Sequence, residues 1–267
     1  MSAAKADDPV LWSIDARQVA RVVPNRPDVN NAYDAELIEG LLAALDALVA
    51  HAGLRAVVIS GNGKHFQAGA DLTWINKVRT ASPQDNLAAS RATGEAVRRL
   101  NAAPLPTIAL VQGGCFGGGT GLIAACDVVI AADNAIFSIA EVRWGLTAAI
   151  IVPQLNDAIG ARQVRRYALT GERFGAEEAR RIGLVHDVVP LADLTTAGER
   201  MVEHLLANGP QAIAETKALA LASAFGHPDE TAFARLVERH AAKRQSAEAA
   251  EGLASFAQKR AARWLDT

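Results

Sequence analysis

A glycine-rich loop is the feature of this sequence best suited to stabilising negative charge. The stretch GGCFGGGTG, residues 113–121, contains six glycines, and the apolar run LIAAC follows it as the expected start of a helix. Backbone amides at a helix N-terminus have no intrahelical partner and carry partial positive charge. Because glycine has no Cβ, a thioester oxygen can approach these amides closely. The loop therefore predicts one half of an oxyanion hole.

A second loop of small residues offers the other half. In FQAGADL, residues 66–72, the residues Ala68, Gly69 and Ala70 leave a strand-like segment and could supply a second, converging amide. Each loop taken alone is better explained as a tight turn between closely packed backbones. Two such loops after two strands favour the oxyanion-hole interpretation.

Nucleotide binding is the other chemistry that a glycine-rich loop suggests, and the spacing argues against it. A dinucleotide-binding turn needs G-x-G-x-x-G after the first strand, whereas these glycines stand at 113, 114, 117, 118, 119 and 121 and follow a later strand. A P-loop needs Gly-Lys-Ser/Thr after the glycines, and the sequence has none there.

The elements that must position these loops alternate between strand and helix. Early strands are predicted at 10–14 and 17–23, and buried strands at 55–60 and 105–112; helices are predicted at 35–51 and 84–101. Residues 122–138 are expected to form a short helix and then strands, and the chain beyond about 153 is expected to be helical apart from 184–189. This order predicts a layered α/β core over residues 1–191, followed by a helical C-terminal region over 192–267.

Composition narrows the class of protein. The chain has 267 residues, a formal charge of -2 and no Lys/Arg-rich run, so no nucleic-acid partner is expected. Neither Cys115 nor Cys126 belongs to a metal-ligand pattern, and no metal site is predicted. The N-terminus lacks the apolar core of a signal peptide, and no apolar run is long enough to cross a membrane. We therefore expect a soluble cytoplasmic protein.

Several motifs in order make the chain similar to a known family. GKHFQAGADL, PTIALVQGGCFGGGTGLIAACDVVIAADNAIFSIAEVRWGL and RRIGLVHDVV resemble the enoyl-CoA hydratase/isomerase (crotonase) family over nearly the whole chain. The resemblance implies a spiral of ββα units, a C-terminal helical trimerisation region, and a homotrimer or a dimer of trimers. It also implies an acyl-CoA substrate whose thioester oxygen binds the amides of Ala70 and Gly118. Coenzyme A is then part of the substrate, and no separate cofactor is expected.

The resemblance further implies which residues bind the substrate. The basic and aromatic side chains of Lys259 and Phe256 match family coenzyme A contacts that can act across a subunit boundary. Trp74, Ile75, Thr147, Ala148 and Ile150 could line an acyl pocket, although each is otherwise ordinary core. The predicted substrate-binding set is Arg26, Ala68, Gly69, Asp71, Leu72, Trp74, Gly117, Gly121, Ala148, Phe256 and Lys259.

One departure from the family pattern concerns the carboxylates. Typical hydratases of the family carry two glutamates; the second matches Glu141, in SIAEVRWGL, but the first falls on Gly121. A carboxyl group in a partly apolar pocket can act as both base and acid. A single glutamate fits a double-bond isomerase, and it fits a hydratase in which Glu141 both activates water and returns the proton. If the space at Gly121 is used, we expect it to hold a bulky branch of the acyl group.

Local motifs favour one substrate class among these. GADLTWI, CFGGGTGLIAACD and AEVRWGLTAAIIVPQL resemble bacterial 3-methylglutaconyl-CoA and isohexenylglutaconyl-CoA hydratases of leucine and acyclic terpene breakdown. Such a substrate carries a distal carboxylate, for which Arg143, Lys77 and Arg79 are candidate donors. The leading hypothesis is a lyase that hydrates a 3-branched glutaconyl-type enoyl-CoA. The alternatives are a Δ3,Δ2-enoyl-CoA isomerase that uses Glu141 alone and a non-catalytic acyl-CoA-binding protein.

Overall fold

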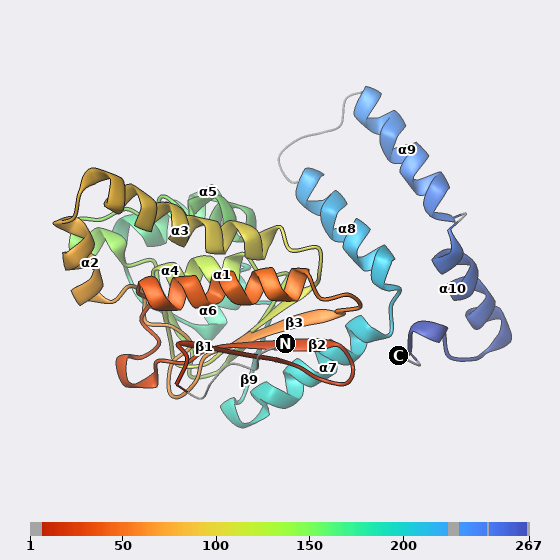
Figure 1. Ribbon diagram of the computed structural model, residues 1–267, viewed down its shortest axis with the longest axis horizontal. Coiled ribbons are helices and arrows are strands. Elements are labelled where there is room, and N and C mark those ends of the chain that lie inside the picture. Colours follow the sequence, from red (N-terminus) through yellow and green to blue (C-terminus); the bar gives the residue numbers. More distant parts are fainter. Residues whose placement is uncertain (1–6, 224–229, 245, 266–267) are drawn as a thin grey trace.

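A six-stranded sheet runs through the protein, whose computed structural model describes residues 7–223, 230–244 and 246–265 (Figure 1). Its strands lie in the order β1 (Val10–Ile14), β2 (Val19–Pro24), β3 (Ala56–Ser60), β4 (Thr107–Val111), β6 (Val128–Ala132) and β9 (Asp187–Val189). The β1–β2 pair is antiparallel, and all the other pairs are parallel. A smaller sheet contains β5 (Gly114–Phe116), β7 (Ile136–Ser138) and β8 (Phe174–Gly175).

Helices cover both faces of the large sheet, because its central strands are apolar on both faces. In β3, Val57 and Ile59 face one hydrophobic core, while Ala56 and Val58 face another. The first core is closed by α1 (Ala35–Val49), α3 (Pro83–Asn101), α4 (Gly118–Ala124), α5 (Val152–Thr170) and α6 (Ala176–Arg181). The second is closed by α7 (Leu194–Leu206), which lies across the opposite face (Figure 1).

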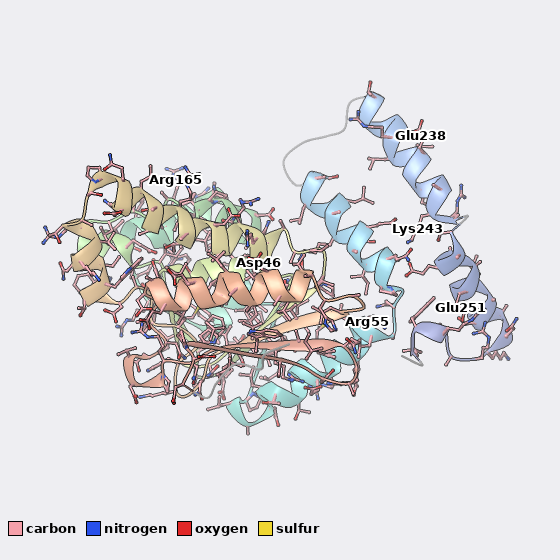
Figure 2. The ribbon with its side chains drawn as sticks, in the orientation of Figure 1. Asp46, Arg55, Arg165, Glu238, Lys243 and Glu251 are labelled. Atoms are coloured by element: carbon pink, nitrogen blue, oxygen red, sulfur yellow. The ribbon has the colours of Figure 1, made fainter. Side chains whose placement is uncertain are left out.

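The last helices extend away from this body. They are α8 (Pro210–Ser223), α9 (Glu230–Arg244) and α10 (Ala247–Gln258), and Figure 1 shows them projecting to one side. The side chain of Arg55 joins this region to the body by donating to the carbonyls of Leu206, Asn208 and Trp264 at 2.8–3.0 Å. Ion pairs of Lys243 and Glu251, both labelled in Figure 2, hold the region together internally.

Most elements expected from the sequence are present. The early strand pair, the helices at 35–49 and 83–101, the helix after the glycine loop and the short strand at 187–189 confirm the predicted order. Three elements were not expected: α2 (Leu72–Arg79), the strand β5 inside the predicted glycine loop, and the two-residue strand β8. The remaining short elements are 3₁₀ turns, η1 (Pro27–Val29), η2 (Glu141–Trp144), η3 (Leu191–Asp193) and η4 (Arg263–Leu265). Within the described residues, no helix has both the length and the apolar character needed to cross a membrane.

Candidate active site

The two loops of small residues run side by side, because backbone hydrogen bonds join them. Gln67 donates to the carbonyl of Gly114 at 3.1 Å, and Phe116 donates back to the carbonyl of Gln67 at 2.9 Å. These bonds form a parallel bridge between Gln67 and Cys115. The chain then turns at Gly69, with φ of +91°, and leads into α2, while the other loop leads into α4. Residues of the two loops therefore line a common pocket.

The amides of Ala70 and Gly118 are available to a ligand. Tyr33 donates to the carbonyl of Gly69 at 2.8 Å and accepts from the amide of Asp71 at 2.9 Å, so the backbone on both sides of Ala70 is fixed. Among the described residues, no backbone carbonyl accepts from the amide of Ala70 or from that of Gly118. Gly118 begins α4, where the first N–H groups have no intrahelical acceptor. Two free amides on one pocket can together hold a thioester oxygen.

Glu141 brings a carboxyl group to the same place. It begins η2, which ends at Gly145 in the left-handed conformation. Its Oε1 approaches the glycine loop so closely that a Cβ at Gly117 would stand 3.0 Å away. Its Oε2 is buried and has no hydrogen-bond partner in the described part of the chain. Burial raises the pKa of Glu141 above its ordinary value, as is common for carboxyl groups that exchange protons in active sites.

The pocket itself has a volume of about 580 Å³ and is lined mainly by apolar groups. The side chains of Trp74, Ile75, Val78, Ala148, Ile150 and Ile151 form this apolar lining. Arg79 from the end of α2 and Asn86 and Ser90 from α3 add polar groups. Arg79 is exposed and is the one cationic side chain among the described residues that line the pocket.

Most residues proposed from the sequence meet in this pocket. Nine of them line it, namely Ala68, Gly69, Ala70, Leu72, Trp74, Gly117, Gly118, Glu141 and Ala148. Ile75, Thr147 and Ile150, which were considered for the acyl pocket, also line it. Of the candidate carboxylate donors, only Arg79 does so within the described chain. Arg143 instead donates to the carbonyl of Gly171 at 2.8 Å, and Lys77 lies exposed on α2.

The remaining residues predicted to bind substrate are not among those that line the pocket in the described structure. The guanidinium of Arg26 pairs with Asp34 at 2.8 Å and with Asp71 at 3.6 Å. The carboxylate of Asp71 also caps α2 by accepting from the amides of Thr73 and Trp74. Lys259 is exposed in the turn after α10 and is not part of the pocket lining. The side chain of Phe256 lies outside the described part of the structure.

Gly121 requires a correction, because the structure fills the space that a substrate branch was expected to use. Gly121 is buried and does not line the pocket. A Cβ there would stand only 2.6 Å from the Cβ of Ile151, whose side chain is 1% exposed. The glycine lets α4 pack against the residue that precedes α5. The absent family glutamate is therefore replaced by a close packing contact.

This contact gives a stability prediction. The Gly121→Ala variant should lose about 1–3 kcal/mol of folding free energy, because a methyl group is forced into a filled site. Thermal unfolding measures the loss. In the double variant with Ile151→Gly, the loss should be smaller than the sum of the two single losses. Additive losses would show that the two residues are not in contact.

Tyr33 is a pocket residue that sequence reasoning missed. It comes from the loop before α1, and its ring contacts Trp74 edge-to-face with centroids 5.7 Å apart. The β-bridge between Tyr33 and Ala70 brings it there. A single tyrosine in the segment NNAYD carries no local signal for this pairing, so only the fold reveals it.

The chain as a whole is similar to known proteins. Residues 15–267 match the family model described as enoyl-CoA hydratase/isomerase. An enoyl-CoA hydratase structure from Shewanella pealeana superposes with a TM-score of 0.92 at 35% identity, covering 98% of this chain and 100% of that one. Pseudomonas aeruginosa AtuE gives 0.91 at 36% identity, with 96% and 99% covered. The 2,3-dehydroadipyl-CoA hydratase of Escherichia coli is 31% identical over 255 residues, with 91% and 94% covered.

Proposed function

The chain belongs to the enoyl-CoA hydratase/isomerase family, and from that premise we propose that it hydrates a 3-branched glutaconyl-type enoyl-CoA. Isohexenylglutaconyl-CoA and 3-methylglutaconyl-CoA are the candidate substrates, in acyclic terpene or leucine breakdown. The observation that carries the proposal is one pocket lined by a buried carboxyl group, two free amides and a single cation: Glu141, Ala70, Gly118 and Arg79.

The proposed reaction uses one carboxyl group twice. The carboxylate of Glu141 takes a proton from water as the water oxygen bonds to C3 of the enoyl group. The π electrons move onto the thioester oxygen, to which the amides of Ala70 and Gly118 donate hydrogen bonds. The protonated Glu141 then delivers the proton to C2, and the thioester carbonyl reforms. The sum is the addition of one water molecule, and the raised pKa of Glu141 suits both proton transfers.

The glutaconyl assignment is supported by the mixed character of the pocket. The apolar lining suits an alkyl branch, whereas a distal carboxylate needs a donor. Arg79 is a cationic lining residue without an ion-pair partner among the described groups, so it is free to meet that carboxylate. The name of the Escherichia coli relative, 2,3-dehydroadipyl-CoA hydratase, likewise describes the thioester of a dicarboxylic acid.

Product analysis tests the function. Purified protein is incubated with 3-methylglutaconyl-CoA, isohexenylglutaconyl-CoA, crotonyl-CoA and a trans-3-enoyl-CoA, and the products are identified by mass spectrometry and chromatography. Hydrated products from the glutaconyl substrates support the proposal. Conversion of the trans-3-enoyl-CoA to its trans-2 isomer, with no hydration, supports the isomerase, which the single carboxyl group also favours. Tight binding without turnover identifies a non-catalytic acyl-CoA-binding protein.

Arg79 gives a separate prediction about substrate choice. The Arg79→Gln variant should raise KM for 3-methylglutaconyl-CoA by roughly 10-fold, because it loses a charge-assisted hydrogen bond. Its kinetics on crotonyl-CoA, which has no distal carboxylate, should be unchanged. Arg91→Gln, at an exposed arginine on α3 outside the pocket, is the matched control. An equal change on both substrates would remove Arg79 from carboxylate recognition.

The assembly and the coenzyme A contacts are part of the same proposal. We infer a homotrimer or a dimer of trimers from the family resemblance, and the cytoplasmic location expected from the sequence stays a prediction. Arg26, Lys259 and Phe256 are proposed to bind the coenzyme A moiety, the last two from a neighbouring subunit. The projecting region α8–α10, which leaves long exposed faces, supports a role in assembly (Figure 1). Sedimentation equilibrium measures the assembly directly.

A further inference from the structure

Tyr33, from the loop before α1, and Glu141, from η2, approach neighbouring residues of the glycine loop. A Cβ at Gly118 would stand 2.7 Å from Cε1 of the Tyr33 ring and 3.4 Å from its hydroxyl oxygen. A Cβ at the preceding Gly117 would stand 3.0 Å from Oε1 of Glu141. The phenol and the carboxyl group therefore lie against consecutive glycines at the start of α4. Both residues also line the pocket.

One oxygen of the Glu141 carboxyl group lacks a partner among the described residues. Within the described chain, Oε2 of Glu141 is buried without a hydrogen-bond partner, so the hydroxyl of Tyr33 does not donate to that oxygen. A buried carboxylate oxygen ordinarily finds a donor, and a water molecule often supplies it. Burial and the nearby charge of Glu141 raise the pKa of Tyr33 to about 12, so the phenol keeps its proton at neutral pH.

We propose that the hydroxyl group of Tyr33 holds the attacking water beside Glu141 during hydration. The inference rests on the proposed function, since it assigns a role in the hydration step. The water donates one hydrogen to the Glu141 carboxylate and the other to the hydroxyl oxygen of Tyr33, which directs its lone pair toward C3. Only the hydrogen donated to Glu141 is transferred, and it later reaches C2. Tyr33 ends the cycle unchanged, so no further reactant is needed.

This role explains how one carboxyl group can suffice. A water molecule held at a single point can rotate away from the attack geometry, and small errors in position lower rates strongly. A second fixed acceptor removes that freedom. Two backbone hydrogen bonds join Tyr33 to the residues on either side of Ala70. They hold Tyr33 in a fixed position relative to the Ala70 amide of the proposed oxyanion hole.

The Tyr33→Phe variant tests the proposal, because it removes only the hydroxyl. Both backbone bonds and the ring contact with Trp74 remain possible. Hydration is measured on crotonyl-CoA and on whichever enoyl-CoA the wild-type enzyme hydrates best. A second assay follows exchange of the C2 protons of saturated 3-methylglutaryl-CoA in D₂O by mass spectrometry. That exchange needs Glu141 and the two amides, but no attacking water.

We expect kcat for hydration to fall about 10- to 100-fold, with KM and the exchange rate within roughly 3-fold of wild type. Tyr167→Phe is the matched control, since it removes a phenol that bonds to Glu178 away from the pocket. It should leave both assays unchanged. Unchanged hydration in Tyr33→Phe, or equal loss in both assays, overturns the role of Tyr33 while the function stands. A wild-type enzyme that hydrates no enoyl-CoA overturns both.

Discussion

Replacing Glu141 with glutamine is expected to reduce turnover by about 10²-fold or more, with little change in the affinity for acyl-CoA. A glutamine keeps the shape of the side chain but cannot accept and return a proton, and general acid–base catalysis contributes about that much. Steady-state kinetics of the purified variant on the best substrate measure the loss. Retention of most of the activity would remove Glu141 from the mechanism.

The same variant should be more stable than the wild type at pH 8. Burial raises the pKa of Glu141 in the folded state above its value in the unfolded chain, so stability is lost as the pH rises from the unfolded-state pKa through the raised folded-state pKa. Glutamine carries no charge, and the variant should therefore unfold at a higher temperature at pH 8. The difference should shrink as the pH falls and the wild-type carboxyl becomes protonated. A variant that is less stable at pH 8 would show that the carboxylate is compensated in the fold.

Removing one amide of the oxyanion hole should also cost much of the activity. The Ala70→Pro variant is expected to lose about 10²–10³-fold in kcat, because proline has no N–H and one such donor is worth roughly 3 kcal/mol in the transition state. The substitution is suited to this position because the amide of Ala70 has no acceptor among the described backbone groups. The flanking bonds of Tyr33, to Gly69 and from Asp71, do not involve it.

Two comparisons make this result interpretable. Ala70→Ser keeps the N–H and should retain nearly full activity, whereas a folded Ala70→Pro with normal turnover would refute the assignment. Circular dichroism and the melting temperature establish that each variant is folded. Gly118 is the less suitable position, since any side chain there, including that of proline, would collide with the ring of Tyr33.

The parts of the site that sequence reasoning found are those encoded in continuous motifs. The two loops follow strands that hydrophobic patterning predicts, and Glu141 was found through the resemblance of SIAEVRWGL to a family motif. The helix α2 was not expected, although Asp71 is the type of residue that caps a helix. Its side chain does accept from the amides of Thr73 and Trp74. A helix of eight residues without a buried face gives a weak periodic signal.

The parts that were missed depend on contacts between distant segments. Tyr33 lines the same pocket as Glu141 because a β-bridge holds it beside Ala70. Gly121 was expected to open space for substrate, whereas the structure puts Ile151 there. The sequence alone shows that a glutamate is absent but not what replaces it, because the replacement comes from the start of another helix. Contacts between distant segments therefore determine both the position of Tyr33 and the packing at Gly121.

The pairing of Gly121 with Ile151 has a consequence for laboratory evolution of this enzyme. A library that varies position 121 alone would test whether a second carboxylate improves hydration of linear substrates, but every side chain it introduces collides with Ile151. The variants in such a library would lose stability, and that loss would obscure any effect of the new side chain on catalysis. The two positions must be varied together, with a small residue at 151 allowing a larger one at 121. The contact therefore makes a site with two carboxylates hard to reach by single substitutions. It requires changes at both 121 and 151, and neither single variant is expected to be favoured.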